Sequence, residues 1–151
     1  MSQITKESLE KNPKPEFSGC QETYERPWGE EQVLVVSEGS YSVKLLRMRA
    51  GTKGGLQYHR KKDEVGYILE GRLLIRYILN EELEEREVRA GDWVRFPVGC
   101  VHQEEAIEET VILEVSTPYL NDRVRVDAVY GLEEEGLTTT HIKDIIEMSE
   151  I

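Results

Sequence analysis

The chain has 151 residues, of which 38% are hydrophobic and 32% are charged, and its formal net charge at pH 7 is −11. This length predicts one domain with a core of its own. The acidic balance argues against nucleic acid or an anionic membrane surface as a partner, but a local positive site is still able to hold an anionic small ligand.

The sequence contains no hydrophobic signal-peptide region and no apolar run of membrane-spanning length. Its two cysteines, Cys20 and Cys100, form no CxxC pair. We therefore expect a reduced, cytoplasmic location with free thiols.

The first 25 residues are predicted to form an N-terminal arm. This segment is polar and contains Pro13 and Pro15. Ser2–Lys11 is a candidate for a short helix that packs on the domain edge, and fraying of this segment is the alternative.

From Gln32 onward, short segments rich in β-branched and aromatic residues alternate with turn signals. The predicted strands are Gln32–Val36, Tyr41–Arg49, Leu56–His59, Glu64–Glu70, Arg72–Leu79, Glu84–Arg89, Trp93–Phe96, Val101–Glu104, Thr110–Ser116 and Arg123–Val129. Many short strands at this spacing favour a sandwich or barrel. We predict an all-β barrel over residues 26–131, followed by an acidic C-terminal tail over residues 132–151 with a short helix at Ile142–Met148.

Two of the three histidines lie in strands bounded by glycines, with a carboxylate between them. Residues two apart in a strand point to the same face, so Gln57 and His59 point together into the barrel or together out of it. Glu64 opens the next strand, and His102 follows the Pro97–Gly99 turn. Two imidazoles, a carboxylate and an amide oxygen suit one divalent transition metal: Zn²⁺, Mn²⁺, Fe²⁺, Ni²⁺ or Co²⁺. Each histidine alone is more typical of a core or surface residue, so the hypothesis depends on the joint spacing.

This spacing resembles the two motifs of the cupin superfamily. The first motif reads Gln57-Tyr58-His59, Glu64 and Gly71, and the second reads Gly91, Pro97-Val98-Gly99, His102 and Ala106. Gln57 replaces the first histidine of the general motif, and Ala106 replaces its closing asparagine. The resemblance implies a double-stranded β-helix, or jelly-roll barrel, to which the sequence adds short N- and C-terminal helical segments.

Among cupins, the chain resembles the cupin domain of type II mannose-6-phosphate isomerases over roughly residues 26–131. The matching residues are Arg26-Pro27-Trp28-Gly29, Leu56-Gln57-Tyr58-His59, Glu64, Pro97-Val98-Gly99, His102, Ile112-Leu113-Glu114-Val115, Tyr119-Leu120, Val124-Arg125 and Tyr130-Gly131. The resemblance implies that the metal ligands are Gln57, His59, Glu64 and His102. It also implies an anionic sugar as the small-molecule ligand and a homodimer. The chain departs from the family at Lys62–Val65, where the family has Arg-Ala-Glu-His, and at Leu132, where it has arginine.

Three further residues are candidate catalytic groups. Lys44 shares a strand face with Leu46 and Met48, so it either points inward to meet a ligand or a buried carboxylate, or snorkels at an edge; the resemblance, which has a lysine here, favours the site. Glu114 is a candidate proton carrier or partner of Lys44, and the alternative is an edge residue that pairs across strands. Arg125 matches the family arginine before Tyr-Gly, where it suits a phosphate, and an exposed salt bridge is the alternative.

We therefore expect a metal-binding cupin that acts on a sugar phosphate or a related small polar ligand. The resemblance implies an enzyme that interconverts aldose and ketose phosphates, with Lys44 or Glu114 moving the proton. One alternative is a non-catalytic or regulatory cupin that binds a small ligand, which the changed Lys62–Val65 run favours. A second alternative is an iron-dependent dioxygenase, and Gln57 counts against it.

Overall fold

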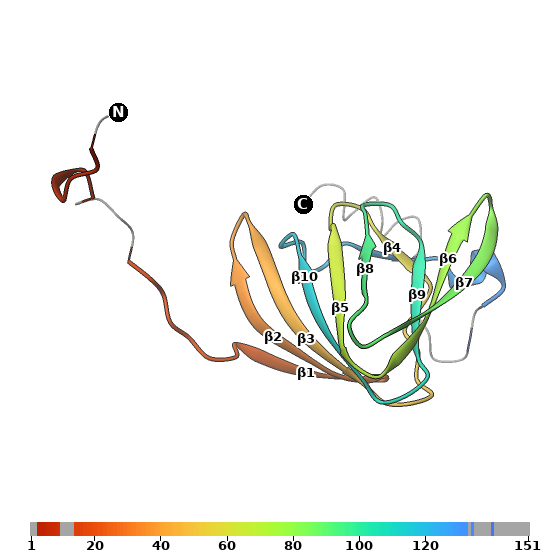
Figure 1. Ribbon diagram of the computed structural model, residues 1–151. Helices are drawn as coiled ribbons and strands as arrows, with labels where there is room; N and C mark the ends of the chain where they lie inside the picture. Colours follow the sequence, from red (N-terminus) through yellow and green to blue (C-terminus); the bar gives the residue numbers. More distant parts are fainter. Residues whose placement is uncertain (1–2, 10–13, 133, 135–139, 141–151) are drawn as a thin grey trace.

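Two antiparallel sheets form almost all of the structure, a computed structural model that describes residues 3–9, 14–132, 134 and 140 (Figure 1). One sheet has six strands in the order β1-β2-β3-β10-β5-β8, and the other has five in the order β11-β4-β9-β6-β7. The strands are β1 (Glu22–Arg26), β2 (Gly29–Ser37), β3 (Tyr41–Met48), β4 (Gln57–His59), β5 (Glu64–Glu70), β6 (Arg72–Leu79), β7 (Glu82–Arg89), β8 (Trp93–Phe96), β9 (His102–Ala106), β10 (Thr110–Ser116) and β11 (Arg123–Arg125). This arrangement confirms the predicted jelly-roll barrel.

Helix is confined to two short 3₁₀ segments within the described residues, η1 (Glu7–Leu9) and η2 (Asp127–Tyr130). The first lies inside the predicted helix Ser2–Lys11. The predicted helix Ile142–Met148 lies outside the described residues.

Strand β1 is absent from the predicted strands. All five of its residues are exposed, so the sequence carries no alternation of apolar and polar residues there. The strand forms by antiparallel pairing with β2, in which Arg26 lies opposite Gly29. Its existence therefore depends on the backbone ladder and not on burial.

The prediction of one strand over Arg123–Val129 is wrong in its second half. The ladder with β4 ends at Arg125, and the chain then turns into η2. Asp127 is the cause, because it is only 1% exposed and its Oδ1 accepts the backbone N–H of Leu56 at 2.8 Å. A buried carboxylate that binds a neighbouring amide draws the chain out of the sheet.

Along the strands, the inward-facing residues change from polar to apolar. The buried residues of β3 are, in order, Ser42, Lys44, Leu46 and Met48. Opposite them in β10 lie Ser116, Glu114, Ile112 and Thr110. The apolar core consists of Leu46, Met48, Ile68, Leu73, Ile75, Val88, Phe96, Ala106 and Ile112. The core thus occupies one part of the interior and leaves the polar part for a site.

We expect Gly71→Ala to lower the free energy of unfolding by about 2–4 kcal/mol. Gly71 has a φ of 86°, and a Cβ there would press against the carbonyl oxygen of Glu109 and the hydroxyl of Thr110. Gly39→Ala is the matched control, since Gly39 has a φ of 75° with nothing within 4 Å of a Cβ. Urea unfolding should show a clearly smaller loss for the control, and equal losses would contradict the close approach at Gly71.

Candidate metal centre

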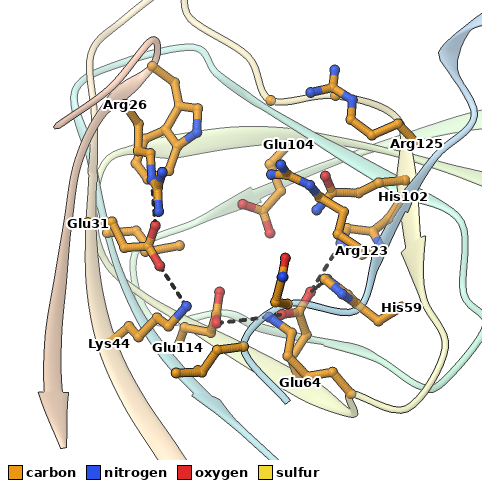
Figure 2. A pocket seen from close by; sticks show the side chains of 18 of the residues that line it. Arg26, Glu31, Lys44, His59, Glu64, His102, Glu104, Glu114, Arg123 and Arg125 are labelled. Atoms are coloured by element: carbon orange, nitrogen blue, oxygen red, sulfur yellow. Dashed lines mark hydrogen bonds and ion pairs between the residues drawn. The ribbon is translucent and has the colours of Figure 1, made fainter. Parts of the chain in front are cut away.

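A cavity of about 540 Å³ lies inside the barrel, with walls from both sheets (Figure 2). The residues that the sequence predicted as metal ligands or catalytic groups all line it: Gln57, His59, Glu64, His102, Lys44, Glu114 and Arg125. The alternation of the strands explains this convergence, because inward positions of neighbouring strands meet in the interior.

His59, Glu64 and His102 form a compact group of potential metal ligands. One ligand atom from each lies within 4.8 Å of the others. The Nε2 atoms of His102 and His59 lie 3.1 and 3.5 Å from the same Oε1 of Glu64. All three residues are buried. Two imidazole nitrogens and a carboxylate that converge in this way match the donor set of a divalent transition-metal site.

The second nitrogen of each imidazole is held by a hydrogen-bond acceptor. Nδ1 of His59 lies 2.9 Å from Oδ1 of Asp122, and Nδ1 of His102 lies 2.9 Å from the carbonyl oxygen of Cys100. When Nδ1 donates its proton to these oxygens, the lone pair of Nε2 points toward Glu64. This is the tautomer that a metal ligand needs, so the surroundings of both rings fit a bound metal.

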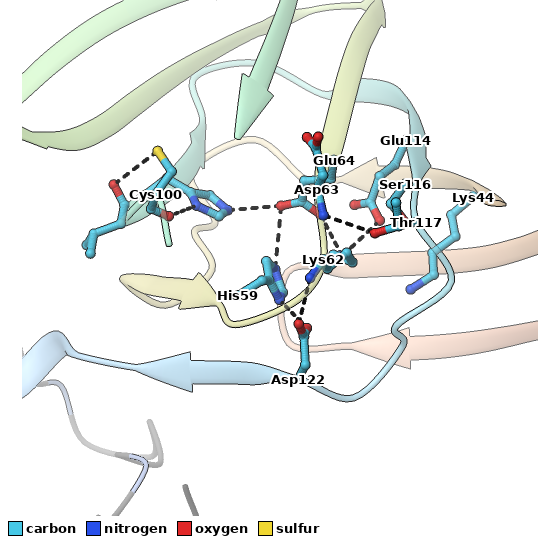
Figure 3. A network of polar contacts seen from close by, with 12 residues as sticks. Lys44, His59, Lys62, Asp63, Glu64, Cys100, Glu114, Ser116, Thr117 and Asp122 are labelled. Atoms are coloured by element: carbon cyan, nitrogen blue, oxygen red, sulfur yellow. Dashed lines mark hydrogen bonds and ion pairs between the residues drawn. The ribbon is translucent and has the colours of Figure 1, made fainter. Parts of the chain in front are cut away.

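Asp122 was not among the predicted site residues. Besides contacting His59, its Oδ2 accepts the backbone N–H groups of Lys61 and Lys62 at 2.7 Å each. The residue therefore holds the ring of His59 and the start of the β4–β5 loop together (Figure 3). No local pattern marks it, because the contact depends on pairing between β4 and β11, in which Arg123 lies opposite His59.

Gln57, the predicted fourth ligand, lies directly opposite His102 in the pairing of β4 with β9. It is half-buried and lines the cavity. Its role as an oxygen ligand stays a prediction.

Lys62 binds the potential metal ligand Glu64 through its second oxygen. Its Nζ lies 2.5 Å from Oε2 of Glu64 and 3.3 Å from Oε1 of Glu114, and the residue is only 6% exposed. Burial opposes the charged ammonium, but the negative charges of Glu114 and Glu64 outweigh it and raise the pKa of Lys62 above its usual value. The run that departs from the isomerase pattern thus supplies a buried cation to the site.

Glu64 stays ionised in spite of its burial. Burial alone would raise its pKa, but the hydrogen bonds from His102 and His59 and the charge of Lys62 hold the pKa below the ordinary value. For His102, burial would lower the pKa, and the hydrogen bond to Glu64 raises it overall. A metal ion must therefore compete with a proton at His102, so metal affinity falls as the pH is lowered.

Lys44 meets a buried carboxylate, as one interpretation of its strand face predicts, but that carboxylate is Glu31 and not Glu114. Lys44 and Glu114 lie opposite each other in the β3–β10 ladder, but Nζ of Lys44 lies 2.6 Å from Oε1 of Glu31. The other oxygen of Glu31 accepts a hydrogen bond from Nε of Arg26 at 2.8 Å. Lys44 is 8% exposed and so is not a snorkelling edge residue, while Glu114 pairs with Lys62 instead.

Glu31 is a second buried carboxylate that holds cations at the cavity wall. Burial raises its pKa, but the hydrogen bonds and charges of Lys44 and then Arg26 outweigh this effect, so the pKa lies below its ordinary value of 4.5. Neither Glu31 nor Arg26 was predicted as a site residue, because their contact depends on the unexpected strand β1 and its hairpin with β2.

Two arginines of β11 add positive charge to the cavity (Figure 2). Nε of Arg125 lies 3.2 Å from Oδ2 of Asp127, while its Nη2 is buried without a hydrogen-bond partner in the described part of the chain. The pKa of Arg123 is lowered by desolvation of its guanidinium group and by the charges of Arg125 and Arg26. The guanidinium groups of Arg125 and Arg26 therefore lie close enough to repel that of Arg123.

The family model described as Cupin matches residues 11–130. The chain belongs to the cupin family. A comparison with curated protein sequences finds no match. No helix among the described residues is long and apolar enough to cross a membrane.

Several solved structures share the fold of this cupin. KdgF from Halomonas sp. has a TM-score of 0.59 and 17% identity, covering 71% of this chain and 98% of its own. The capsular polysaccharide assembling protein CapF from Staphylococcus aureus has a TM-score of 0.57 and 20% identity, and the match covers 69% of this chain and 33% of CapF. Oxalate decarboxylase from Bacillus subtilis, which has Mn(II) centres, has a TM-score of 0.61 and 19% identity, and the match covers 76% of this chain and 32% of the decarboxylase. The cupin spans about a third of the latter two chains, and these identities show the fold alone.

Glu104 is a further cavity residue that the sequence analysis missed. It follows His102 by two positions in β9 and points into the same cavity (Figure 2). Burial raises its pKa to about 7, an effect that the charge of His102 opposes and that of Glu64 reinforces. Strand alternation would have found it, because residues two apart share a face.

We expect Asp122→Asn to weaken binding of Zn²⁺ or Mn²⁺ about 10- to 100-fold, the usual effect of losing a carboxylate that orients a histidine ligand. Asparagine keeps the size of the side chain but removes the charge that holds Nδ1 of His59. Competition with a chelating dye measures the affinity. The control Asp63→Asn removes a carboxylate that binds Arg95 and does not line the cavity, so it should leave the affinity unchanged. Equal affinity in wild type and Asp122→Asn would contradict the assigned role.

We expect Lys44→Met to lower the free energy of unfolding at pH 7 by about 1–3 kcal/mol, because buried Glu31 then keeps only Arg26 as a partner. The wild-type pKa of Glu31 lies below 4.5, so its stabilising contribution is present above pH 4.5 and is lost as the pH falls through the folded-state value. The difference between variant and wild type should therefore shrink below that pH.

Urea unfolding at several pH values tests this expectation. Lys53→Met is the control, since Lys53 pairs with exposed Glu134, and such surface pairs contribute little. A stability difference for Lys44→Met that does not change with pH would show that lost packing, and not the Glu31 charge, is responsible.

Proposed function

We propose that this cupin is a metal-dependent enzyme that binds an anionic sugar and interconverts aldose and ketose phosphates, as mannose-6-phosphate isomerases do. The observation that carries the proposal is the combination of two features in one cavity. A group of potential metal ligands, His59, Glu64 and His102, faces the same space as buried Lys44 and half-buried Arg125. The first feature suits a polarised carbonyl or hydroxyl oxygen, and the second suits a negative charge.

The donor atoms and their surroundings support a resident metal. Both histidines have Nδ1 engaged and Nε2 directed at Glu64, and Gln57 lies beside His102 with an amide oxygen to offer. A divalent metal held there would supply a Lewis acid for the carbonyl oxygen or the neighbouring hydroxyl of the sugar. Lys62, bound to the second oxygen of Glu64, keeps that oxygen engaged while Oε1 faces the two histidines.

We assign the proton transfer between C1 and C2 to Glu114. It is a carboxylate on the inward face of β10 that lines the cavity, and its contact with Nζ of Lys62 holds its position. Lys44 is bound tightly to Glu31, so we assign it to binding a sugar oxygen and not to removing a proton. This division uses the carboxylate as the base and the ammonium group as a hydrogen-bond donor.

The anionic group of the sugar is assigned to Arg125. Its buried Nη2 lacks a partner among the described residues, and a buried donor without an acceptor carries a free-energy cost. An anionic oxygen would remove that cost through a charge-assisted hydrogen bond. Arg123 lies close enough to add a second positive charge.

A direct test is the interconversion of fructose-6-phosphate and mannose-6-phosphate by protein loaded with Zn²⁺ or Co²⁺. Wild type is expected to be active, and His102→Ala is expected to lose both activity and metal binding. Asp63→Asn, outside the cavity, should retain both. Metal-loaded wild-type protein without activity on any hexose phosphate would overturn the substrate assignment.

A non-catalytic cupin that binds a small ligand is the second candidate. It is favoured by Lys62, because the ammonium group binds both Glu64 and Glu114 and so occupies an oxygen of the proposed proton carrier. A rise in melting temperature on adding a sugar phosphate, without turnover, would select this function over the isomerase.

A further inference from the structure

Glu104 projects from β9 into the cavity that holds the candidate metal centre (Figure 2). Its neighbour in the chain, Glu105, lies on the outer side of the sheet, where its Oε2 accepts a hydrogen bond from Nη1 of Arg76 at 2.6 Å. Alternation along the strand therefore gives two adjacent carboxylates opposite surroundings. The metal ligands and the proposed proton transfer leave Glu104 without a role.

Glu104 differs from the other carboxylates on the cavity wall in having no cation among the described residues. The other three are each bound to a lysine: Glu31 to Lys44 at 2.6 Å, and Glu64 and Glu114 to Lys62 at 2.5 and 3.3 Å. Glu104 forms no hydrogen bond or ion pair through its side chain within the described part of the chain. Its oxygens are therefore free to accept a hydrogen bond from a ligand.

A hydrogen-bond donor without a partner lies on the same wall. Nη2 of Arg125 is buried and has no acceptor among the described residues. The guanidinium group packs over Gly55, where a Cβ would overlap it, and its Nε lies 3.2 Å from Oδ2 of Asp127. These contacts hold the guanidinium group in place and leave one of its donors unused.

Strand pairing brings this donor to the same part of the wall as Glu104. The backbone N–H of Gly54 donates to the carbonyl oxygen of Glu104 at 3.0 Å, so the glycine that Arg125 covers lies beside β9 at this position. Along the same strands, Gln57 lies opposite both Arg125 and His102. An unused donor and an unused acceptor thus share one side of the cavity with a potential metal ligand.

We propose that Glu104 is a specificity-determining residue that accepts hydrogen bonds from sugar hydroxyl groups, while Arg125 holds the anionic group of the same molecule. The inference rests on the proposed function, in which Arg125 binds the anion, and it specifies the rest of the ligand. A molecule that satisfies both residues carries an anionic group and hydroxyl groups, as a sugar phosphate does. A phosphate ester without hydroxyl groups would take water from the carboxyl group of Glu104 and return no hydrogen bond, so the site discriminates against it.

Isothermal titration calorimetry of the full chain in the presence of Zn²⁺ tests this specificity with two probes. Mannose-6-phosphate carries hydroxyl groups, and n-hexyl phosphate has the same number of carbons without them. Wild type should bind mannose-6-phosphate more tightly. Glu104→Leu and Glu104→Ala should each weaken binding of mannose-6-phosphate by about 10-fold or more, as loss of a hydrogen bond to a charged group does, without weakening binding of n-hexyl phosphate. Glu104→Gln keeps an oxygen acceptor and should have an intermediate affinity for the sugar phosphate.

Glu105→Leu is the matched control, because it makes the same change one position along β9 and outside the cavity. It should leave both affinities unchanged, whereas Arg125→Met should weaken both. Circular dichroism with thermal melting checks that each variant folds. Equal weakening of the two probes by the Glu104 variants, an unchanged affinity for mannose-6-phosphate, the same loss in Glu105→Leu, or a wild type that does not distinguish the probes would each overturn the proposal.

The outcome is separable from that of the proposed isomerase activity. A selective loss of sugar-phosphate binding in Glu104→Leu, together with a wild type that shows no turnover, would support the role of Glu104 and overturn the isomerase. Isomerase activity with the same KM for mannose-6-phosphate in wild type and Glu104→Leu would overturn the role of Glu104 alone.

Discussion

Glu64 is the buried charge on which the arrangement of the cavity depends. A carboxylate with 6% exposure is costly unless hydrogen bonds and opposite charges compensate it. One of its oxygens receives both histidines and the other receives Lys62. Lys62 in turn binds Glu114, so the proposed metal centre and the proposed proton carrier are tied to the same network. Removing any one member would leave another buried member of the network with one partner fewer.

The same principle explains how an acidic chain keeps a cationic cavity. Two buried lysines lie on its walls, and each is bound to carboxylates: Lys62 to Glu64 and Glu114, and Lys44 to Glu31. The arginines are less completely compensated, since Arg125 retains a buried nitrogen without an acceptor in the described residues. The positive charge that remains available thus lies near β11, across the cavity from Glu31 and Lys44 (Figure 2). An anion would bind there without displacing the ion pairs that hold the metal ligands.

The two sheets share one interior but differ in their outward faces. Their inward faces share one interior, where apolar residues form the core and polar residues form the cavity. Their outward faces differ: Arg76 pairs with Glu85 and Glu105 on the five-stranded sheet, whereas Trp93, Tyr67 and Leu113 lie side by side on the six-stranded sheet. Strand alternation separates these outward residues from the residues of the site.

Local patterns in the sequence were sufficient to predict the barrel and the group of His59, Glu64 and His102, because alternation fixes which side chains share a face and turn glycines fix where strands end. They were not sufficient to predict partners. Lys44 and Glu114 are neighbours in the ladder, yet each binds another residue, since a long flexible side chain reaches past the adjacent position. Asp122 lies 63 residues from His59 in the chain, and strand β1 has no buried residue to reveal it. The sequence by itself determined which residues face the interior, and the tertiary structure alone decided which of them bind one another, because those contacts depend on pairing between distant strands.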